Sequence, residues 1–132
     1  MRRVYSGDKL RWVMALRLLI VDDNLDFLEA ARGLLDGDGI SVVGIATTLA
    51  EGLRLVGELE PDVTLVDVDL GEESGFEFVR RLTAMEVIRT HRVILTSAYT
   101  EEDFAELVNS SPAIGFLPKA DLSVGAIAEL IG

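Results

Sequence analysis

The chain has 132 residues, the length of one ordinary domain, and its 49% hydrophobic and 27% charged residues exclude an intrinsically disordered chain. It has no cysteine, which excludes disulfides and thiolate chemistry, and its single histidine excludes a metal site built on a histidine pair. The formal net charge of -11 argues against direct binding of nucleic acid, which begins with neutralisation of phosphates. No apolar run approaches the ~20 residues of a membrane span, so we expect no membrane insertion.

The start of the chain differs from the rest in charge. Residues 1–17 hold five basic residues and one acidic residue, a balance of +4, which leaves -15 for residues 18–132. The apolar stretch at residues 12–16 is broken by Arg17 and lacks the small-residue pattern of a signal-peptide cleavage site. We therefore predict a flexible N-terminal arm over residues 1–14, a single domain over residues 15–132 and a cytoplasmic location.

The predicted domain begins with a strand, a helix and a second strand. Residues 18–21 are apolar throughout, which is typical of a strand buried on both faces. Apolar residues then recur at helical spacing from Leu28 to Leu35, and glycines at positions 37 and 39 end this helix. A second strand is predicted at residues 41–46.

Four more helices and three more strands follow in alternation. Thr48 and Glu51 form the signature of a capping box at the start of the second helix, and Pro61 closes that unit. Strands are predicted at residues 63–66, 92–96 and 115–118, and apolar spacing marks helices around residues 76–82, 104–108 and 124–131.

Five strands alternating with five helices predict an α/β fold with a parallel sheet covered by helices on both faces. The smallest such architecture is a doubly wound, flavodoxin-like sheet with strand order 2-1-3-4-5 and right-handed crossovers. A barrel would need eight such units and about twice the length.

Polar side chains stand where four of the predicted strands end. Asp22 and Asp23 follow the first strand, Asp67 the third, Ser97 the fourth and Lys119 the fifth. In this architecture ligands bind beyond the carboxyl ends of the strands, at the point where the strand order reverses. We therefore expect these five side chains to converge on one pocket.

The chemistry of this cluster points to phosphoryl transfer. Two carboxylates ~4 Å apart repel by roughly 4 kcal/mol at an effective dielectric of about 20, so three in one pocket need a cation or shifted pKa values. Oxygen ligands without His or Cys suit Mg²⁺, with Mn²⁺ as a second possible ion. An aspartate beside such an ion can attack phosphorus, while Lys119 offsets the charge of the phosphoryl group and Ser97 donates a hydrogen bond to it. The pattern predicts phosphoryl transfer onto Asp67.

Three motifs occur in order along the chain. They are Leu19-Ile20-Val21-Asp22-Asp23-Asn24, then Leu65-Val66-Asp67 with Gly75 eight residues later, and Gly115-Phe116-Leu117-Pro118-Lys119. With these motifs at this spacing, residues 16–131 resemble the receiver domain of two-component response regulators.

The resemblance implies a role for each residue of the pocket. Asp67 would be the phosphoacceptor, Asp23 a direct Mg²⁺ ligand, Asp22 a ligand acting largely through water, and the backbone carbonyl of Asp69 a further ligand. Lys119 would pair with Asp67 and later with its phosphoryl group.

The resemblance also implies a conformational switch. Ser97, 22 residues before Lys119, aligns with the switch hydroxyl of the family, and Thr96 is the alternative. Phe116 lies at the position of the second switch residue, an aromatic one. Asp69 and Tyr99 fall at the two variable positions that tune the lifetime of the aspartyl phosphate.

The chain departs from the family pattern at three places. Ala120 stands where the family often has a proline joined by a cis peptide, and we expect a trans bond because a cis bond before alanine costs ~3 kcal/mol. Gly71 replaces a common proline after the phosphoacceptor. Pro112 lies in a tight segment, residues 108–113, which predicts a short or displaced fourth helix.

The resemblance implies a signalling module that is phosphorylated by a histidine kinase or phosphotransfer protein. Because only Gly132 follows the last predicted helix, we expect a stand-alone receiver that signals to another protein by docking, by dimerising on phosphorylation or as a phosphate relay. It is consumed stoichiometrically and is therefore not expected to be an enzyme.

Two alternatives come from other classes. Asp67-Val68-Asp69 also resembles the Asp-x-Asp motif of haloacid-dehalogenase-like phosphatases, which place it after their first strand rather than their third. An FMN-binding flavodoxin-like module would need a phosphate loop rich in Ser, Thr and Gly after the first strand, and this chain has an acidic pair there.

Overall fold

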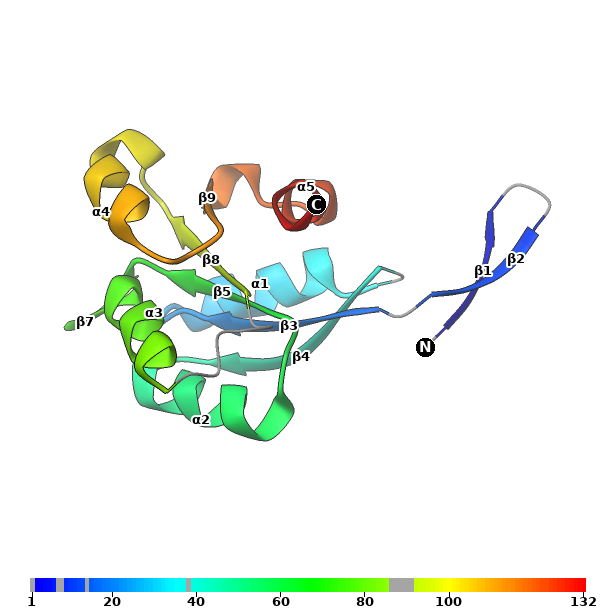
Figure 1. Ribbon diagram of the computed structural model, residues 1–132, viewed down its shortest axis with the longest axis horizontal. Helices are drawn as coiled ribbons and strands as arrows, with labels where there is room; N and C mark the ends of the chain where they lie inside the picture. The colour runs from blue at the N-terminus through cyan, green and yellow to red at the C-terminus, as the bar shows by residue number, and fades with distance from the viewer. Residues whose placement is uncertain (1, 7–8, 14, 38, 86–91) are drawn as a thin grey trace.

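A five-stranded parallel sheet forms the centre of the molecule (Figure 1). The computed structural model describes residues 2–6, 9–13, 15–37, 39–85 and 92–132. The strands are β3 (Leu16–Val21), β4 (Ile40–Ala46), β5 (Val63–Asp67), β8 (Arg92–Ser97) and β9 (Gly115–Pro118). They lie in the order β4-β3-β5-β8-β9, which is 2-1-3-4-5 when these strands are counted along the chain. The predicted doubly wound fold is confirmed.

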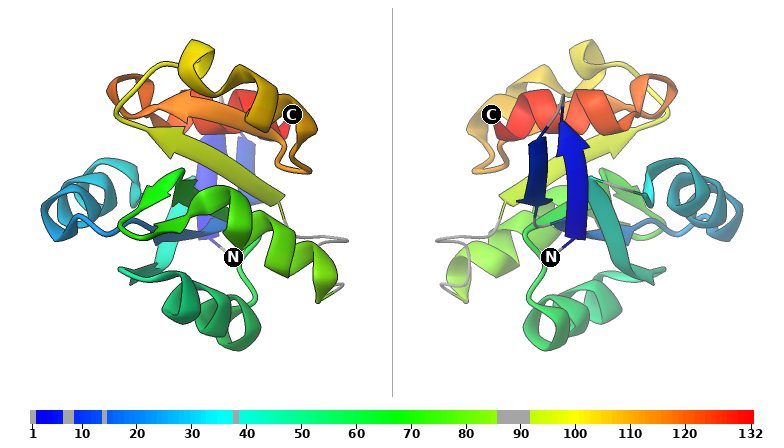
Figure 2. Two further views of the ribbon diagram at one scale, coloured as in Figure 1. Left: turned by 90° about the vertical axis from the view of Figure 1, so that its left-hand side faces the viewer. Right: turned by 90° about the vertical axis from the view of Figure 1, so that its right-hand side faces the viewer.

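Helices cover both faces of the sheet. They are α1 (Leu25–Leu35), α2 (Leu49–Leu59), α3 (Gly75–Ala84), α4 (Ala105–Ser110) and α5 (Val124–Ile131). Figure 2 shows α1 and α3 on opposite sides of the strands. Because the strand order reverses after β4, crossovers of one hand place α1 and α5 on one face and α2, α3 and α4 on the other, which buries the central strands on both sides.

The alternation of side chains along β3 divides the core into two layers. Leu18 and Ile20 belong to a buried cluster that includes residues of α1 and α5. Leu19 and Val21, their neighbours in the strand, belong to a second cluster with Phe78 of α3. All four residues of this run are fully buried, as the apolar sequence predicted.

Side-chain caps fix where the first two helices begin, and a residue in the left-handed conformation ends the second. Asn24 caps α1 by accepting a hydrogen bond from the N–H of Phe27 at 3.1 Å. Thr48 caps α2 by accepting from the N–H of Glu51 at 3.2 Å, which is one half of the predicted capping box. Glu60, with a φ of 47°, ends α2 in the left-handed conformation just before Pro61.

The fourth helical segment is short, as predicted. It starts with a 3-10 turn, η1 (Glu101–Phe104), and continues as the six-residue α4, which has no buried residue. The Ser110 hydroxyl contacts the carbonyl oxygen of Glu106 at 3.0 Å, and Pro112 has no N–H to extend the helix. Phe104 anchors the segment, with ring centroids 6.5 Å from Phe76 and 6.2 Å from Phe116.

Several small elements were not predicted. An antiparallel hairpin of β1 (Arg2–Ser6) and β2 (Lys9–Val13) precedes the sheet along the chain, and the domain boundary at residue 15 remains a prediction. Two-residue strands, β6 (Asp69–Leu70) and β7 (Glu73–Ser74), pair around Gly71, whose φ is 72°. A 3-10 turn, η2 (Lys119–Asp121), follows β9 directly.

Two further observations concern the described residues. No cis peptide bond occurs among them, so the bond before Ala120 is trans as predicted. None of the helices in the described ranges is long and apolar enough to cross a membrane.

Candidate functional site

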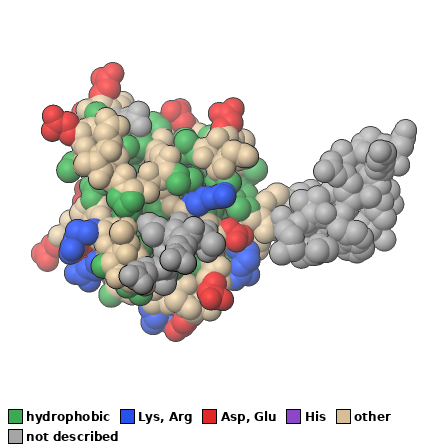
Figure 3. Space-filling view, in the orientation of Figure 1, with side chains coloured by type: hydrophobic (Ala, Val, Ile, Leu, Met, Phe, Trp, Pro, Cys, Tyr) green, Lys and Arg blue, Asp and Glu red, His purple; other side chains and the backbone are tan. Residues whose placement is uncertain are grey.

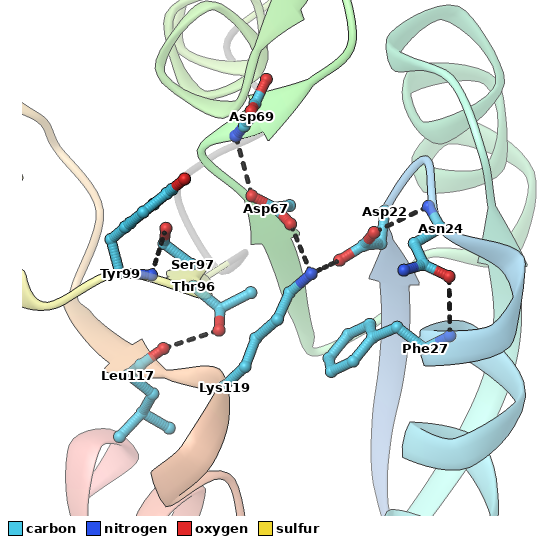
Figure 4. Close-up of polar contacts among 10 residues, drawn as sticks. All are labelled: Asp22, Asn24, Phe27, Asp67, Asp69, Thr96, Ser97, Tyr99, Leu117 and Lys119. Atoms are coloured by element: carbon cyan, nitrogen blue, oxygen red, sulfur yellow. Dashed lines mark hydrogen bonds and ion pairs between the residues drawn. The ribbon is translucent and has the colours of Figure 1, made fainter.

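The site lies at the edge of the sheet where the parallel strands end (Figure 4). Asp22 follows β3, Asp67 is the last residue of β5, Ser97 is the last residue of β8, and Lys119 follows β9. These residues come from four separate parts of the chain. The parallel topology brings them to one edge because all five strands point the same way.

Lys119 joins the two aspartates. Its Nζ atom lies 2.7 Å from Asp67 Oδ2 and 2.8 Å from Asp22 Oδ2. The Asp22 side chain is fully buried, that of Asp67 is 7% exposed and that of Lys119 is 19% exposed. The ammonium thus offsets the repulsion between two carboxylates that are held out of water.

Two backbone N–H groups aim the aspartates at the lysine. The N–H of Asn24 donates to Asp22 Oδ1, and the N–H of Asp69 donates to Asp67 Oδ1, each at 2.8 Å. Since a backbone N–H group two residues further along the chain is bonded to the Oδ1 atom of each aspartate, the two Oδ2 atoms are left to face Lys119. The chain geometry therefore sets the orientation of both carboxylates.

Burial and neighbouring charges shift the pKa values of Asp67 and Lys119. Burial raises the pKa of Asp67 above its usual value, and the nearby Asp22 acts in the same direction, although the hydrogen bonds from Lys119 and Asp69 oppose them. Burial acts to lower the pKa of Lys119, but its contacts with Asp22 and Asp67 outweigh this and raise that pKa. Lys119 is therefore held in its charged form.

The two candidate switch hydroxyls differ in their bonding. The Thr96 hydroxyl donates to the carbonyl oxygen of Leu117 at 2.6 Å and so ties β8 to β9. The Ser97 oxygen accepts from the N–H of Tyr99 at 3.0 Å, which leaves its own O–H able to donate. Both residues are buried, with 1% and 2% exposure.

The other predicted residues lie around this centre. Asp23 is exposed, and its Oδ2 atom is 3.6 Å from the point where a Cβ on Gly71 would stand. Asp69 and Tyr99 are also exposed, at the rim of the site, whereas Phe116 is buried against Phe104.

The aspartates of the site carry the oxygen ligands that a hard cation prefers, but their side chains do not converge on a common point. Within the described ranges no three Asp, Glu, His or Cys side chains are grouped so that they could hold a metal ion. Lys119 supplies the positive charge between Asp22 and Asp67, and Asp23 would have to turn inward to complete a set of three carboxylates. These oxygen donors fit Mg²⁺ in chemical type.

One residue of the site, Phe27, was not among the predicted ones. The ring centroid of Phe27, in the first turn of α1, lies 4.1 Å from Lys119 Nζ. The available signal was its position one helical turn after the acidic pair, which places an aromatic ring beside the strand ends.

Fold and site together define a class of protein. A doubly wound sheet with two buried aspartates and a lysine at its carboxyl edge is the architecture of a receiver module. Residues 18–127 match the family model of the response regulator receiver domain. The chain belongs to this family of two-component signalling modules.

Individual relatives agree with this assignment. Response regulator GacA of Pseudomonas viridiflava is 32% identical over 121 residues, which cover 88% of this chain and 52% of that protein. A protein-glutamate methylesterase/protein-glutamine glutaminase 2 of Syntrophomonas wolfei is 35% identical over 109 residues, covering 82% of this chain and 30% of that protein. The chain thus spans about half the length of the matched regulator and less of the methylesterase.

A solved structure shows the same arrangement. The signal receiver domain of the putative response regulator NarL from Mycobacterium tuberculosis superposes with a TM-score of 0.78 at 28% identity. The match covers 89% of this chain and 98% of that domain, so its extent coincides with the receiver itself.

Proposed function

We propose that this chain accepts a phosphoryl group on Asp67 from a phosphohistidine of a histidine kinase or phosphotransfer protein. The observation that carries the proposal is the Lys119 ammonium, 2.7 Å from Asp67 and 2.8 Å from Asp22 at the carboxyl edge of the sheet. Membership of the receiver family supports the same role.

In the proposed step a carboxylate oxygen of Asp67 attacks phosphorus. The new O–P bond forms as the P–N bond of the donor breaks, and the imidazole nitrogen keeps the electron pair and takes up a proton. The product is an acyl phosphate on Asp67. Lys119 would offset the charge of the phosphoryl oxygens, and the free O–H of Ser97 would donate to one of them. Thr96, whose hydroxyl is engaged by Leu117, is the less suitable donor.

Receiver domains in general bind Mg²⁺ at their phosphorylation site. In this chain we assign the site to Asp22, Asp23, Asp67 and the backbone carbonyl of Asp69, with Mn²⁺ as the alternative ion. When bound, the ion supplies positive charge next to the transferred group. Gly71 lies next to the Asp23 carboxylate in the loop after Asp67, and its φ of 72° favours glycine at this position.

The signal would leave the site through β8 and β9. Phe116, on β9, contacts Phe104, which in turn contacts Phe76 of α3. Phosphorylation that moves Ser97 would therefore act on the η1–α4 segment, where Leu107 is 53% exposed. The proposed readout is binding to a downstream protein or dimerisation, in the cytoplasm where the phosphodonor proteins act. Asp69 and Tyr99, at the exposed rim, are the positions proposed to set the phosphate lifetime.

The test is intact-protein mass spectrometry after incubation with acetyl phosphate and Mg²⁺, beside a magnesium-free sample. We expect one phosphoryl adduct that depends on Mg²⁺, is cleaved by hydroxylamine and is absent in Asp67→Asn. Asp62→Asn is the matched control, because Asp62 precedes the same strand at its opposite end, where it accepts from the N–H of Arg17 at 2.8 Å.

Two results would contradict the proposal. An undiminished adduct in Asp67→Asn would move the acceptor to another residue. Continuous release of inorganic phosphate without an adduct, abolished by Asp69→Asn, would instead identify a phosphatase-like hydrolase that uses Asp67 and Asp69.

A further inference from the structure

We propose that Phe27 is a positioning residue that holds the Lys119 ammonium between the two aspartates. The ring centroid is 4.1 Å from Nζ, well within the range of a cation–π contact. Figure 4 shows the ring beside the end of the lysine side chain, on the side of α1. The inference deepens the proposed function, because this lysine contacts the proposed phosphoacceptor.

The start of α1 holds the backbone of Phe27, and the core beneath the helix holds its side chain. The backbone N–H of Phe27 donates to the Asn24 side chain at 3.1 Å, in the first turn of α1. The side chain is partly buried and packs against the hydrophobic cluster beneath α1, which includes Leu18 and Leu28. A ring held in this way presents a fixed face to the ammonium.

The Lys119 ammonium is surrounded by an aromatic ring as well as by two carboxylates. It carries three N–H groups, and the contacts with Asp22 and Asp67 use two directions. The ring covers a further approach to Nζ, and the lysine side chain is only 19% exposed. Phe27 therefore excludes water from the ammonium and restricts it to the conformation that faces Asp67.

Variants at position 27 separate this role from ordinary packing. Phe27→Leu keeps an apolar side chain that can fill the same part of the core but removes the aromatic face. Phe27→Met does the same with an unbranched side chain and serves if the leucine variant fails to fold. Phe27→Tyr keeps the ring face and should rescue what the aliphatic variants lose.

The first readout is the proton exchange and chemical shift of the Lys119 ammonium, measured in the metal-free and unphosphorylated protein. The chain has only two lysines, Lys9 and Lys119, so nitrogen-15 spectra of lysine ammonium groups are readily assigned with Lys119→Arg. We expect a Lys119 signal with slow proton exchange and an upfield ring-current shift in the wild type and in Phe27→Tyr. In Phe27→Leu and Phe27→Met the exchange should speed up until the signal broadens or disappears.

The second readout is the rate of phosphorylation by acetyl phosphate with Mg²⁺. Loss of the aromatic face should lower this rate about 3- to 10-fold, with recovery in Phe27→Tyr. Leu34→Ala is the matched control, because Leu34 lies in the same helix and is 58% exposed, and its rate should equal that of the wild type.

The two readouts also distinguish the two proposals. Equal ammonium exchange and equal rates in the wild type and Phe27→Leu would overturn the role of Phe27 and leave phosphorylation of Asp67 standing. A protected, ring-shifted Lys119 signal in a wild-type chain that forms no adduct would support the positioning contact and overturn the proposed function.

Discussion

Gly75 allows the loop after the proposed phosphoacceptor to fold back onto the sheet. Its N–H donates to the carbonyl oxygen of Val68 at 2.9 Å. A Cβ at this position would stand 2.3 Å from the carbonyl oxygen of Asp67, which is closer than any real contact. The obstacle is backbone rather than a flexible side chain, so the loop itself would have to move.

We expect Gly75→Ala to lower the free energy of unfolding by about 1 to 3 kcal/mol and to slow phosphorylation of Asp67. The physical reason is that relief of the contact displaces the residue that carries the acceptor carboxylate. Urea unfolding and the acetyl phosphate assay measure the two effects.

Gly57→Ala is the control for this prediction. Gly57 lies in α2 and is exposed, and apart from its chain neighbours and the backbone of its own helix no described atom lies within 4 Å of the point where its Cβ would stand. The same change should therefore raise stability there by up to about 1 kcal/mol. A Gly75→Ala protein as stable as the wild type would show that the Asp67 loop has more freedom than this close approach implies.

At the scale of single residues, sequence reasoning reached the polar centre but not its surroundings. Asp22, Asp67 and Lys119 could be placed together because each follows an apolar strand, and parallel strands end at one edge. The position of Phe27 one helical turn after the acidic pair places its ring near the strand ends, but its contact with Lys119 could not be predicted, because the contact also depends on the angle at which α1 leaves β3. The inward or outward orientation of Asp23 likewise depends on the conformation of a loop.

An ion-pair cluster stabilises the first turns of α3. Glu77 accepts from Arg80 Nε at 2.6 Å and from Arg81 Nε at 3.2 Å. The hydrogen bond from Arg80 is the largest cause that lowers the pKa of Glu77, to about 2. Glu77 also lies near the N-terminus of the helix, where a negative charge is favourable.

This shift gives a pH dependence with a definite sign. A folded-state pKa of about 2, below the usual 4.5, means that the ionised Glu77 stabilises the fold above pH 4.5. This contribution is lost as the pH falls through the range between those two values. Glu77→Gln should therefore lower the urea midpoint at pH ~6 and lower it less at pH ~3, because part of the wild-type advantage has then gone.

The double variant Arg80→Gln/Arg81→Gln, which removes both partners, should show the same convergence with the wild type at low pH. An equal loss of midpoint at both pH values would mean that Glu77 acts through packing or helix propensity rather than through its charge.

The predicted helices and strands differ from the observed ones at a few places, and each difference has a physical cause. Strand β3 begins at Leu16 rather than residue 18, because Arg17 pairs with Ser41 of β4 although a basic residue breaks the apolar run. Strands β6 and β7 have two residues each, too few for any alternation to show. The fourth helix opens with a 3-10 turn whose residues carry ordinary helix-start chemistry.

On the face of the molecule that Figure 3 shows, the charged side chains are scattered rather than gathered in one patch. Acidic and basic side chains alternate there with hydrophobic ones, while the net charge of the chain is -11. The strand order could be predicted at this scale because right-handed crossovers and helices on both faces leave few arrangements of five strands. The proposed downstream partner could not be predicted, because no pattern among the described exposed residues specifies its chemistry.

The whole-molecule architecture predicts which part of the chain is needed for stability. Among the residues whose burial the structure describes, both hydrophobic clusters are built from residues between Leu16 and Ile131. The hairpin of β1 and β2 pairs within itself and is a separate sheet from the central one. Removal of residues 1–13, leaving Met14 as the first residue, should therefore change Tm by less than ~2 °C and leave the rate of phosphorylation unchanged.

Calorimetry of the full and shortened chains at equal ionic strength measures this difference. Equal ionic strength matters because the removed segment is basic and its loss makes the remaining domain more acidic. A drop in Tm of ~5 °C or more, about 1 kcal/mol for a domain of this size, would show that the N-terminal segment packs onto the receiver domain. The site lies at the carboxyl end of β3, whereas the hairpin precedes the amino end of that strand. Slower phosphorylation of the shortened chain without a loss of Tm would therefore contradict the separation of the hairpin from the receiver domain.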